Sequence, residues 1–213
     1  MALVQRTNTA NIVHTPNHVI LFQGNEIEST VTNSAAVIED WLSQIYSCLH
    51  NGTRIIVGLD CKHKSSYFSK SEVLQLCVDR KCLVIQLCHL DIIPQTLLDF
   101  VRDPNILFVG VGVSNLVRRL NEYNKLDCSS AIEAYKLANH SYSSSLLSKC
   151  GYDPCLTNLA TYVLGSPWVV EKPVFVTESN WGTSVLSVEQ IRYASIDAYV
   201  IYRIGRAPLS KNI

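Results

Sequence analysis

The chain has 213 residues, of which 47% are apolar and 17% charged, and its 18 basic side chains balance 18 acidic ones. That length is enough for one domain with a hydrophobic core of ordinary size. The apolar content excludes a disordered chain, and the zero net charge excludes a histone-like protein that binds nucleic acid through bulk charge. A zero net charge still allows a groove that is basic only locally.

The chain contains eight cysteines, a number that would indicate a disulfide scaffold in a short secreted protein. Here the chain is long, and residues 1–17 are polar without the apolar stretch of a secretory signal. No segment approaches the roughly 18 apolar residues of a membrane span. We therefore expect a protein of the cytoplasm, and also of the nucleus, that has no membrane contact and uses its cysteines as small hydrophobic residues.

The first half of the chain is expected to form a hairpin, a helix and three buried strands. The hairpin covers residues 19–31, and Gly24 lies in its tight turn. A helix is expected from Ser34 to Leu49, because apolar residues recur there at i, i+3 and i+4. Three strands follow, and the first of them ends at Asp60. They span residues 54–59, 73–78 and 82–87.

The second half is expected to alternate helices and strands and then to become helical. The expected helices are 94–102, 115–123, 156–164 and 187–204, and the expected strands are 107–111 and 131–133. Ser187 and Gln190 have the spacing of a capping box, and residues 167–183 form a long irregular segment. This order of elements predicts an α/β domain, a mixed sheet with helices on both faces, over residues 19–206. Residues 1–18 are an N-terminal extension and 207–213 a C-terminal tail.

Three segments place an acidic residue or a pair of glycines in or beside an expected strand or helix. They are Ile56–Asp60 (IVGLD), Phe108–Val113 (FVGVGV) and Tyr193–Tyr199 (YASIDAY). Asp60 follows a buried strand, and Tyr193 and Asp197 share one helical face because they are four residues apart. In their order and spacing, the segments resemble the three motifs of the DnaQ-like 3'–5' exonucleases that have a tyrosine in the third motif. The resemblance is to the Werner-syndrome type and its plant relatives, and it covers residues 19–206.

The resemblance implies a ribonuclease H-like fold, with a mixed five-stranded sheet and helices on both faces. It also implies phosphodiester hydrolysis assisted by two Mg²⁺ or Mn²⁺ ions about 4 Å apart. Hard divalent ions prefer oxygen ligands, and four carboxylates supply them in the family. By motif matching, Asp60 takes the first carboxylate position and Asp197 the last, while Tyr193 takes the position that orients the attacking water.

Two of the four carboxylate positions do not match the family pattern. The second acidic residue of the first motif falls on Lys62, and the aspartate of the second motif falls on Leu116. One hypothesis is that the Lys62 ammonium replaces a metal ion. A single ion would then be held by the two aspartates, with Asn115 or Glu133 adding an oxygen.

The same two substitutions allow a second and a third hypothesis. A neighbouring subunit could complete the site, or the domain could be a catalytically impaired relative that binds RNA or a protein partner. The surviving pair of Tyr193 and Asp197 is evidence for an enzyme, because a relic has no chemical reason to keep it.

Small plant proteins of this type include the RISC-interacting clearing 3'–5' exoribonucleases, which the short chain also resembles. That resemblance implies a homo-oligomer, such as a hexamer, that removes short single-stranded RNA fragments associated with Argonaute. We expect Lys62 and Lys64 to contact the nucleic acid, because basic groups beside the cleft attract phosphates, and we expect Asn115 to contact it as well. Stacking of bases is expected on Tyr67 or Phe68, and Trp181 is expected to line the cleft.

Overall fold

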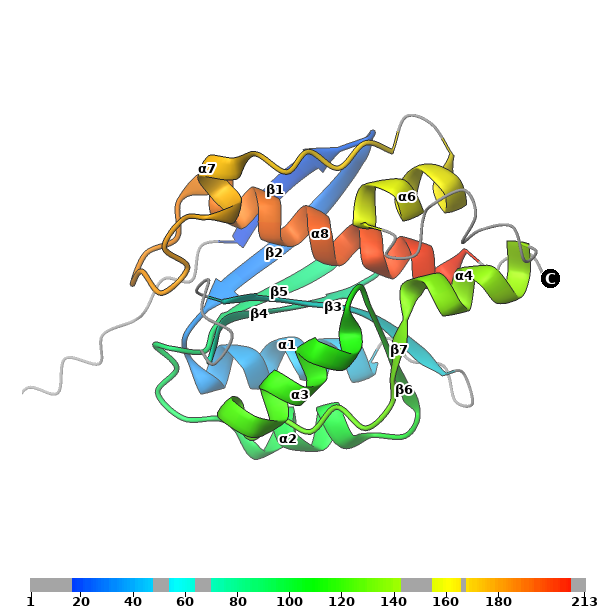
Figure 1. Cartoon of the computed structure of the whole chain (residues 1–213). Helices are drawn as coiled ribbons and strands as arrows, with labels where there is room; N and C mark the ends of the chain where they lie inside the picture. The colour runs from blue at the N-terminus through cyan, green and yellow to red at the C-terminus, as the bar shows by residue number, and fades with distance from the viewer. Residues whose placement is uncertain (1–16, 48–53, 64–69, 143–154, 166–167, 208–213) are drawn as a thin grey trace, which may run out of the picture.

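The computed structural model describes residues 17–47, 54–63, 70–142, 155–165 and 168–207. Within these ranges a seven-stranded mixed sheet forms the centre of the molecule (Figure 1). Its strands are β1 (Asn17–Phe22), β2 (Asn25–Thr32), β3 (Ile55–His63), β4 (Ser71–Val78), β5 (Lys81–Gln86), β6 (Ile106–Gly110) and β7 (Ala131–Glu133). Across the sheet the strands lie in the order β1-β2-β5-β4-β3-β6-β7.

The sheet has seven strands in the described residues, where the resemblance predicts five. The antiparallel hairpin β1–β2 joins the sheet because β2 pairs with β5 in parallel, with Thr30 opposite Leu83. At the other edge, the short strand β7 pairs with β6 in parallel. Strand β4 runs antiparallel to both of its neighbours, β3 and β5, so the sheet is mixed, as predicted.

Helices cover both faces of the sheet, which confirms the predicted α/β class (Figure 1). One face carries α1 (Ala35–Ser47), α2 (Gln95–Arg102) and α3 (Val113–Asn124), and the other carries α4 (Ala134–Tyr142), α6 (Leu156–Leu164), α7 (Val174–Thr177) and α8 (Val188–Arg206). Helices α4 and α7 lie where the sequence predicts none. Each face of the sheet has its own buried apolar cluster.

Strand β3 runs further than predicted and gives the site its geometry. It continues past Asp60 to His63, so Asp60 and Lys62 both lie within a strand. Side chains two residues apart in a strand point to the same face. Because Leu59 packs on the α1–α3 face, Asp60 and Lys62 point to the opposite face, which α8 covers.

Helix α8 lies close against β3 because Gly58 has no side chain. A Cβ atom at that position would lie 2.2 Å from the carbonyl oxygen of Ala198 and 2.7 Å from the amide nitrogen of Tyr202. A hydrogen bond of 2.7 Å between the hydroxyls of Ser29 and Ser195 also joins α8 to β2. The glycine therefore allows the carboxylates of the strand and the helix to approach each other.

The start of α8 has the predicted capping box. The Ser187 hydroxyl accepts a hydrogen bond from the Gln190 amide at 3.2 Å, and the Gln190 side chain accepts one from the Ser187 amide at 2.9 Å. These contacts satisfy two backbone donors at the helix end and fix where α8 begins. None of the helices in the described ranges is long and apolar enough to cross a membrane.

Candidate active site

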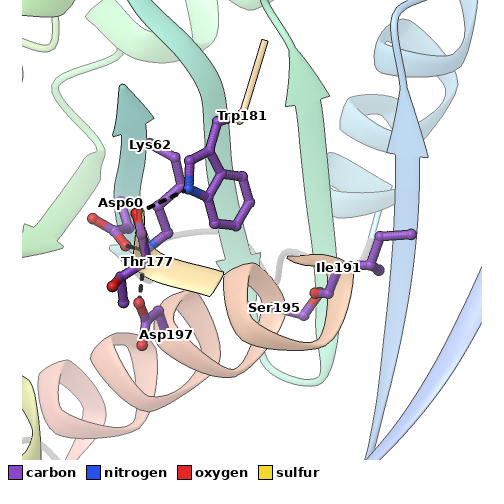
Figure 2. A network of polar contacts seen from close by, with 7 residues as sticks. All are labelled: Asp60, Lys62, Thr177, Trp181, Ile191, Ser195 and Asp197. Atoms are coloured by element: carbon purple, nitrogen blue, oxygen red, sulfur yellow. Dashed lines mark hydrogen bonds and ion pairs between the residues drawn. The ribbon is translucent and has the colours of Figure 1, made fainter. Parts of the chain in front are cut away.

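Asp60, Lys62 and Asp197 form a three-residue ionic cluster between β3 and α8 (Figure 2). The Nζ atom of Lys62 lies 2.6 Å from Oδ2 of Asp60 and 2.6 Å from Oδ2 of Asp197. The cluster is poorly accessible to solvent, since the exposed fractions of the Asp60, Lys62 and Asp197 side chains are 19%, 12% and 1%. One ammonium thus bridges the first and third motifs.

The two carboxylates keep the Lys62 side chain charged despite its burial. Burial alone would lower the pKa of this ammonium, because it disfavours the charged form. The negative charges of Asp197 and Asp60 act in the opposite direction and outweigh burial, so the pKa of Lys62 is raised above its ordinary value. Lys62 is therefore a permanent cation at any physiological pH.

Two aromatic rings enclose the same ammonium. Nζ of Lys62 lies 4.4 Å from the centroid of the Tyr193 ring and 5.9 Å from that of Trp181. Trp181 is buried, and its Nε1–H donates to the carbonyl of Thr177 at 3.4 Å (Figure 2). Cations are attracted to the faces of aromatic rings, so these contacts add to the two ion pairs. Trp181 was predicted to line the cleft; it lies beside the Lys62 ammonium, and its side chain is buried.

The Tyr193 phenol is held in its protonated form. Burial raises its pKa, and the neighbouring Asp197 carboxylate raises it further, while the Lys62 ammonium acts in the opposite direction. A phenol that stays protonated can donate a hydrogen bond and accept one at the same time. That is the property required of a group that orients a water molecule.

The described residues of the cluster offer two carboxylates to a divalent ion, Asp60 and Asp197. Among the described residues, no group of three or more His, Cys, Asp or Glu side chains could hold a metal ion, so the four-carboxylate arrangement is missing there. Mg²⁺ nevertheless often binds through one or two carboxylates together with water and substrate phosphates. Oδ1 of Asp197 is buried and has no hydrogen-bond partner in the described part of the chain. Asp60 and Asp197 are therefore the residues that would hold one Mg²⁺ or Mn²⁺.

None of the other predicted site residues forms a hydrogen bond or ion pair with this cluster in the described part of the chain, and some lie outside the described ranges. Leu116 is buried in the apolar cluster on the α1–α3 face, and Asn115 is exposed beside it on α3. The Glu133 carboxylate accepts hydrogen bonds from the backbone amides of Gly112 at 3.0 Å and Ser114 at 3.4 Å, at the start of α3. Lys64, Tyr67 and Phe68 are among the residues that the structure does not describe.

Two residues near the cluster were not predicted. Gly58 sets the distance between β3 and α8, and its sequence signal was a glycine inside an apolar strand, which often marks a close backbone approach. Gln75 of β4 lies directly opposite Asp60 in the antiparallel pair and is fully buried. Its amide nitrogen and oxygen have no partner within the described ranges, and no sequence pattern singled it out.

Comparison with known proteins places this chain in a family. A family profile described as "3'-5' exonuclease" matches residues 30–210, which is most of the chain. The chain belongs to the 3'-5' exonuclease family.

Individual relatives agree with that assignment. A 3'-5' exonuclease of Drosophila ananassae is 30% identical over 63% of this chain. The bifunctional 3'-5' exonuclease/ATP-dependent helicase WRN of Mus musculus is 28% identical over 70% of the chain. The match covers 38% of the Drosophila protein and 11% of WRN, so the chain spans less than half the length of either.

A solved structure supports the fold. The EXO domain of Aedes aegypti Nibbler matches with a TM-score of 0.67 and 17% identity, over 85% of this chain and 87% of its own. At this level of identity the match bears on the fold only. The predicted ribonuclease H-like fold and the Werner-type resemblance are both confirmed at the level of the exonuclease family.

Proposed function

We propose that this chain is a 3'-5' exoribonuclease that hydrolyses single-stranded RNA from its 3' end with the help of a divalent ion. The observation that carries the proposal is the meeting of Asp60, Tyr193 and Asp197 at one point between β3 and α8. These are the three positions of the exonuclease motifs that the sequence retains. Membership of the family supports the direction of attack and the class of reaction.

The residues present would divide the reaction between them. Asp60 and Asp197 would hold one Mg²⁺ or Mn²⁺, and Oδ1 of Asp197 is a buried oxygen free to do so among the described residues. When bound, such an ion polarises the scissile phosphate and neutralises developing charge. The protonated phenol of Tyr193 would orient the attacking water, since it can donate and accept a hydrogen bond.

A cavity beside Tyr193 supports a single-stranded substrate. It has a volume of about 430 Å³ and lies between β1, α7 and α8. Its lining includes Phe175, which is 72% exposed, Arg192, and two acidic residues, Glu171 and Glu189. Exposed aromatic rings beside a cationic group are the usual means of binding unpaired bases. We infer that bases near the 3' end stack in this cavity, and that Lys64 and Asn115 contact the strand elsewhere.

The partners are part of the same proposal and rest on the resemblance to the RISC-interacting subgroup. We propose that the chain forms a homo-oligomer and acts on RNA fragments bound to Argonaute, in the cytoplasm and also in the nucleus. Size-exclusion chromatography with light scattering measures the oligomer directly. A strict monomer that degrades RNA would exclude the oligomer as a requirement for activity.

The activity is tested with a single-stranded RNA labelled at its 5' end. We expect a ladder of products shortened from the 3' end in Mg²⁺ or Mn²⁺, and no ladder in EDTA. The double variant with Asp60→Asn and Asp197→Asn should give no ladder. Asp40→Asn is the matched control, because Asp40 is an exposed carboxylate on α1 that contacts Gln44.

Two results would overturn the proposal. The first is intact RNA after incubation of the folded wild type with either ion, with binding of the RNA retained; this would indicate a binding protein. The second is an unchanged ladder in the double variant. A DNA strand of the same sequence tests the preference for RNA, and faster cleavage of the DNA would contradict that part.

A further inference from the structure

We propose that the ammonium of Lys62 is a built-in cation that takes the place of one of the two divalent ions used by the family. The inference rests on the proposed function and deepens it, because it assigns one cation position of the site to the chain itself. It is carried by the position of a single atom, Nζ, between the carboxylates of the first and third motifs.

The ammonium occupies the place where a bridging cation would bind. Nζ lies 2.6 Å from an oxygen of Asp60 and 2.6 Å from an oxygen of Asp197. The ammonium therefore takes one oxygen of each carboxylate, while Oδ1 of Asp197 has no partner among the described residues. A divalent ion placed between these two Oδ2 atoms would have to displace the lysine, so an ion held by Asp60 and Asp197 with Lys62 in place would use their other oxygens.

The charges of the site balance with one divalent ion rather than two. Four carboxylates balance two divalent ions, but here Lys62 and Leu116 stand at two of the four carboxylate positions. Asp60 and Asp197 carry two negative charges, and the Lys62 ammonium cancels one of them. With one divalent ion the site has a net charge of about +1, which a substrate phosphate can balance. With two ions the net charge would be about +3, which is unfavourable in a poorly solvated site.

The ammonium is also held firmly in place. The Tyr193 and Trp181 rings enclose it, and only 12% of the Lys62 side chain is exposed. Leaving this position would break two ion pairs and expose the buried Asp197 carboxylate without a partner. A fixed cation also explains why Leu116 can stand where the family has an aspartate, because a site that binds fewer ions needs fewer carboxylate ligands.

The test counts bound Mn²⁺ by electron paramagnetic resonance of the ion left free in solution, in the absence of RNA. The full chain is compared with Lys62→Met, which is close in size but uncharged, and with Lys62→Arg, which keeps the charge. We expect Lys62→Met to bind one more Mn²⁺ per chain than the wild type, and Lys62→Arg to match the wild type. Lys62→Gln provides a second neutral variant if the methionine variant folds poorly.

Thermal denaturation gives an independent readout. Mn²⁺ should raise the melting temperature of the neutral variants more than that of the wild type, because the ion replaces the missing ammonium. Equal Mn²⁺ counts in the wild type and both neutral variants would overturn the inference, as would two ions bound to the wild type. If the count rises as expected but the wild type does not cut RNA, the inference about Lys62 stands and the proposed function fails.

Discussion

The ring of Tyr193 lies against the ammonium of Lys62, with 4.4 Å between Nζ and the ring centroid. Tyr193 thus has two separable parts: a ring that contacts the cation and a hydroxyl group that can orient water. Asp197 lies one turn further along α8 and binds the same ammonium. Tyr193 and Asp197, which the third motif retains, thus both contact Lys62, the residue that replaces the second acidic residue of the first motif.

Tyr193→Phe separates these two parts. We expect the variant to retain its stability to within about 1 kcal/mol, because the ring still contacts Lys62. The rate of RNA cleavage should fall about 100-fold, because the attacking water loses its orienting group. Urea denaturation and the gel ladder measure the two quantities on one preparation. An unchanged cleavage rate would show that the Tyr193 hydroxyl has no catalytic role.

Gly58→Ala tests the close approach of β3 and α8. The new methyl group would meet the backbone of Ala198 and Tyr202, which cannot move without shifting the helix. We expect a loss of about 1–3 kcal/mol in the free energy of unfolding, and a loss of activity as Asp60 and Asp197 move apart. Gly205→Ala, within α8 itself, is the control.

The control differs in what the added methyl group meets. At Gly205 the nearest atoms are side-chain methyl groups of Val109 and Ile56, at 2.9 and 3.1 Å, rather than backbone atoms as at Gly58. Alanine also favours a helix over glycine by about 1 kcal/mol. Equal stability and equal activity of the two alanine variants would contradict the role given to Gly58.

The stability that Lys62 provides should not depend on pH over the physiological range. A group whose pKa is raised on folding stabilises the protein fully below its unfolded pKa, ordinarily 10.5, and loses that contribution as the pH rises through the folded value. The difference in unfolding free energy between wild type and Lys62→Met should therefore be constant between about pH 7 and about pH 9. Urea denaturation of both proteins measures this difference, with EDTA present so that bound divalent ions do not contribute. A decline over that range would mean that burial outweighs the two carboxylates.

Glu133→Ala tests the cap at the start of α3. The Glu133 carboxylate accepts hydrogen bonds from the backbone amides of Gly112 and Ser114, and a negative charge at this helix end is favourable. We expect the variant to lose about 1 kcal/mol of stability and to bind as many Mn²⁺ ions as the wild type. A lower Mn²⁺ count would instead make Glu133 an additional metal ligand.

The sequence predicted the α/β class and the meeting of the retained motif residues. Apolar runs located the strands, and the spacing of Tyr193 and Asp197 placed both on one helical face. The expected end of β3 at Asp60 was wrong, because polar residues can continue an apolar strand when the sheet pairs them, as β4 pairs Lys62 with Val73. With the strand ended early, the shared orientation of Asp60 and Lys62 could not be derived.

Several features depend on contacts between distant segments. The position of the Lys62 ammonium needs Asp197, which is 135 residues away in the chain. Gln75 is buried opposite Asp60 only because β3 and β4 pair in this register. The sheet exceeds five strands because β2 pairs with β5, which no local pattern indicates.

Lys62 is proposed to occupy one cation position of an exonuclease site that retains Asp60, Tyr193 and Asp197. The most direct measurement is anomalous diffraction at the manganese edge from crystals of the wild type soaked in Mn²⁺. We predict a single anomalous peak beside Asp60 and Asp197, with Nζ of Lys62 still within hydrogen-bond distance of Asp197. Two peaks at this site, with the Lys62 side chain turned away from both carboxylates, would contradict it.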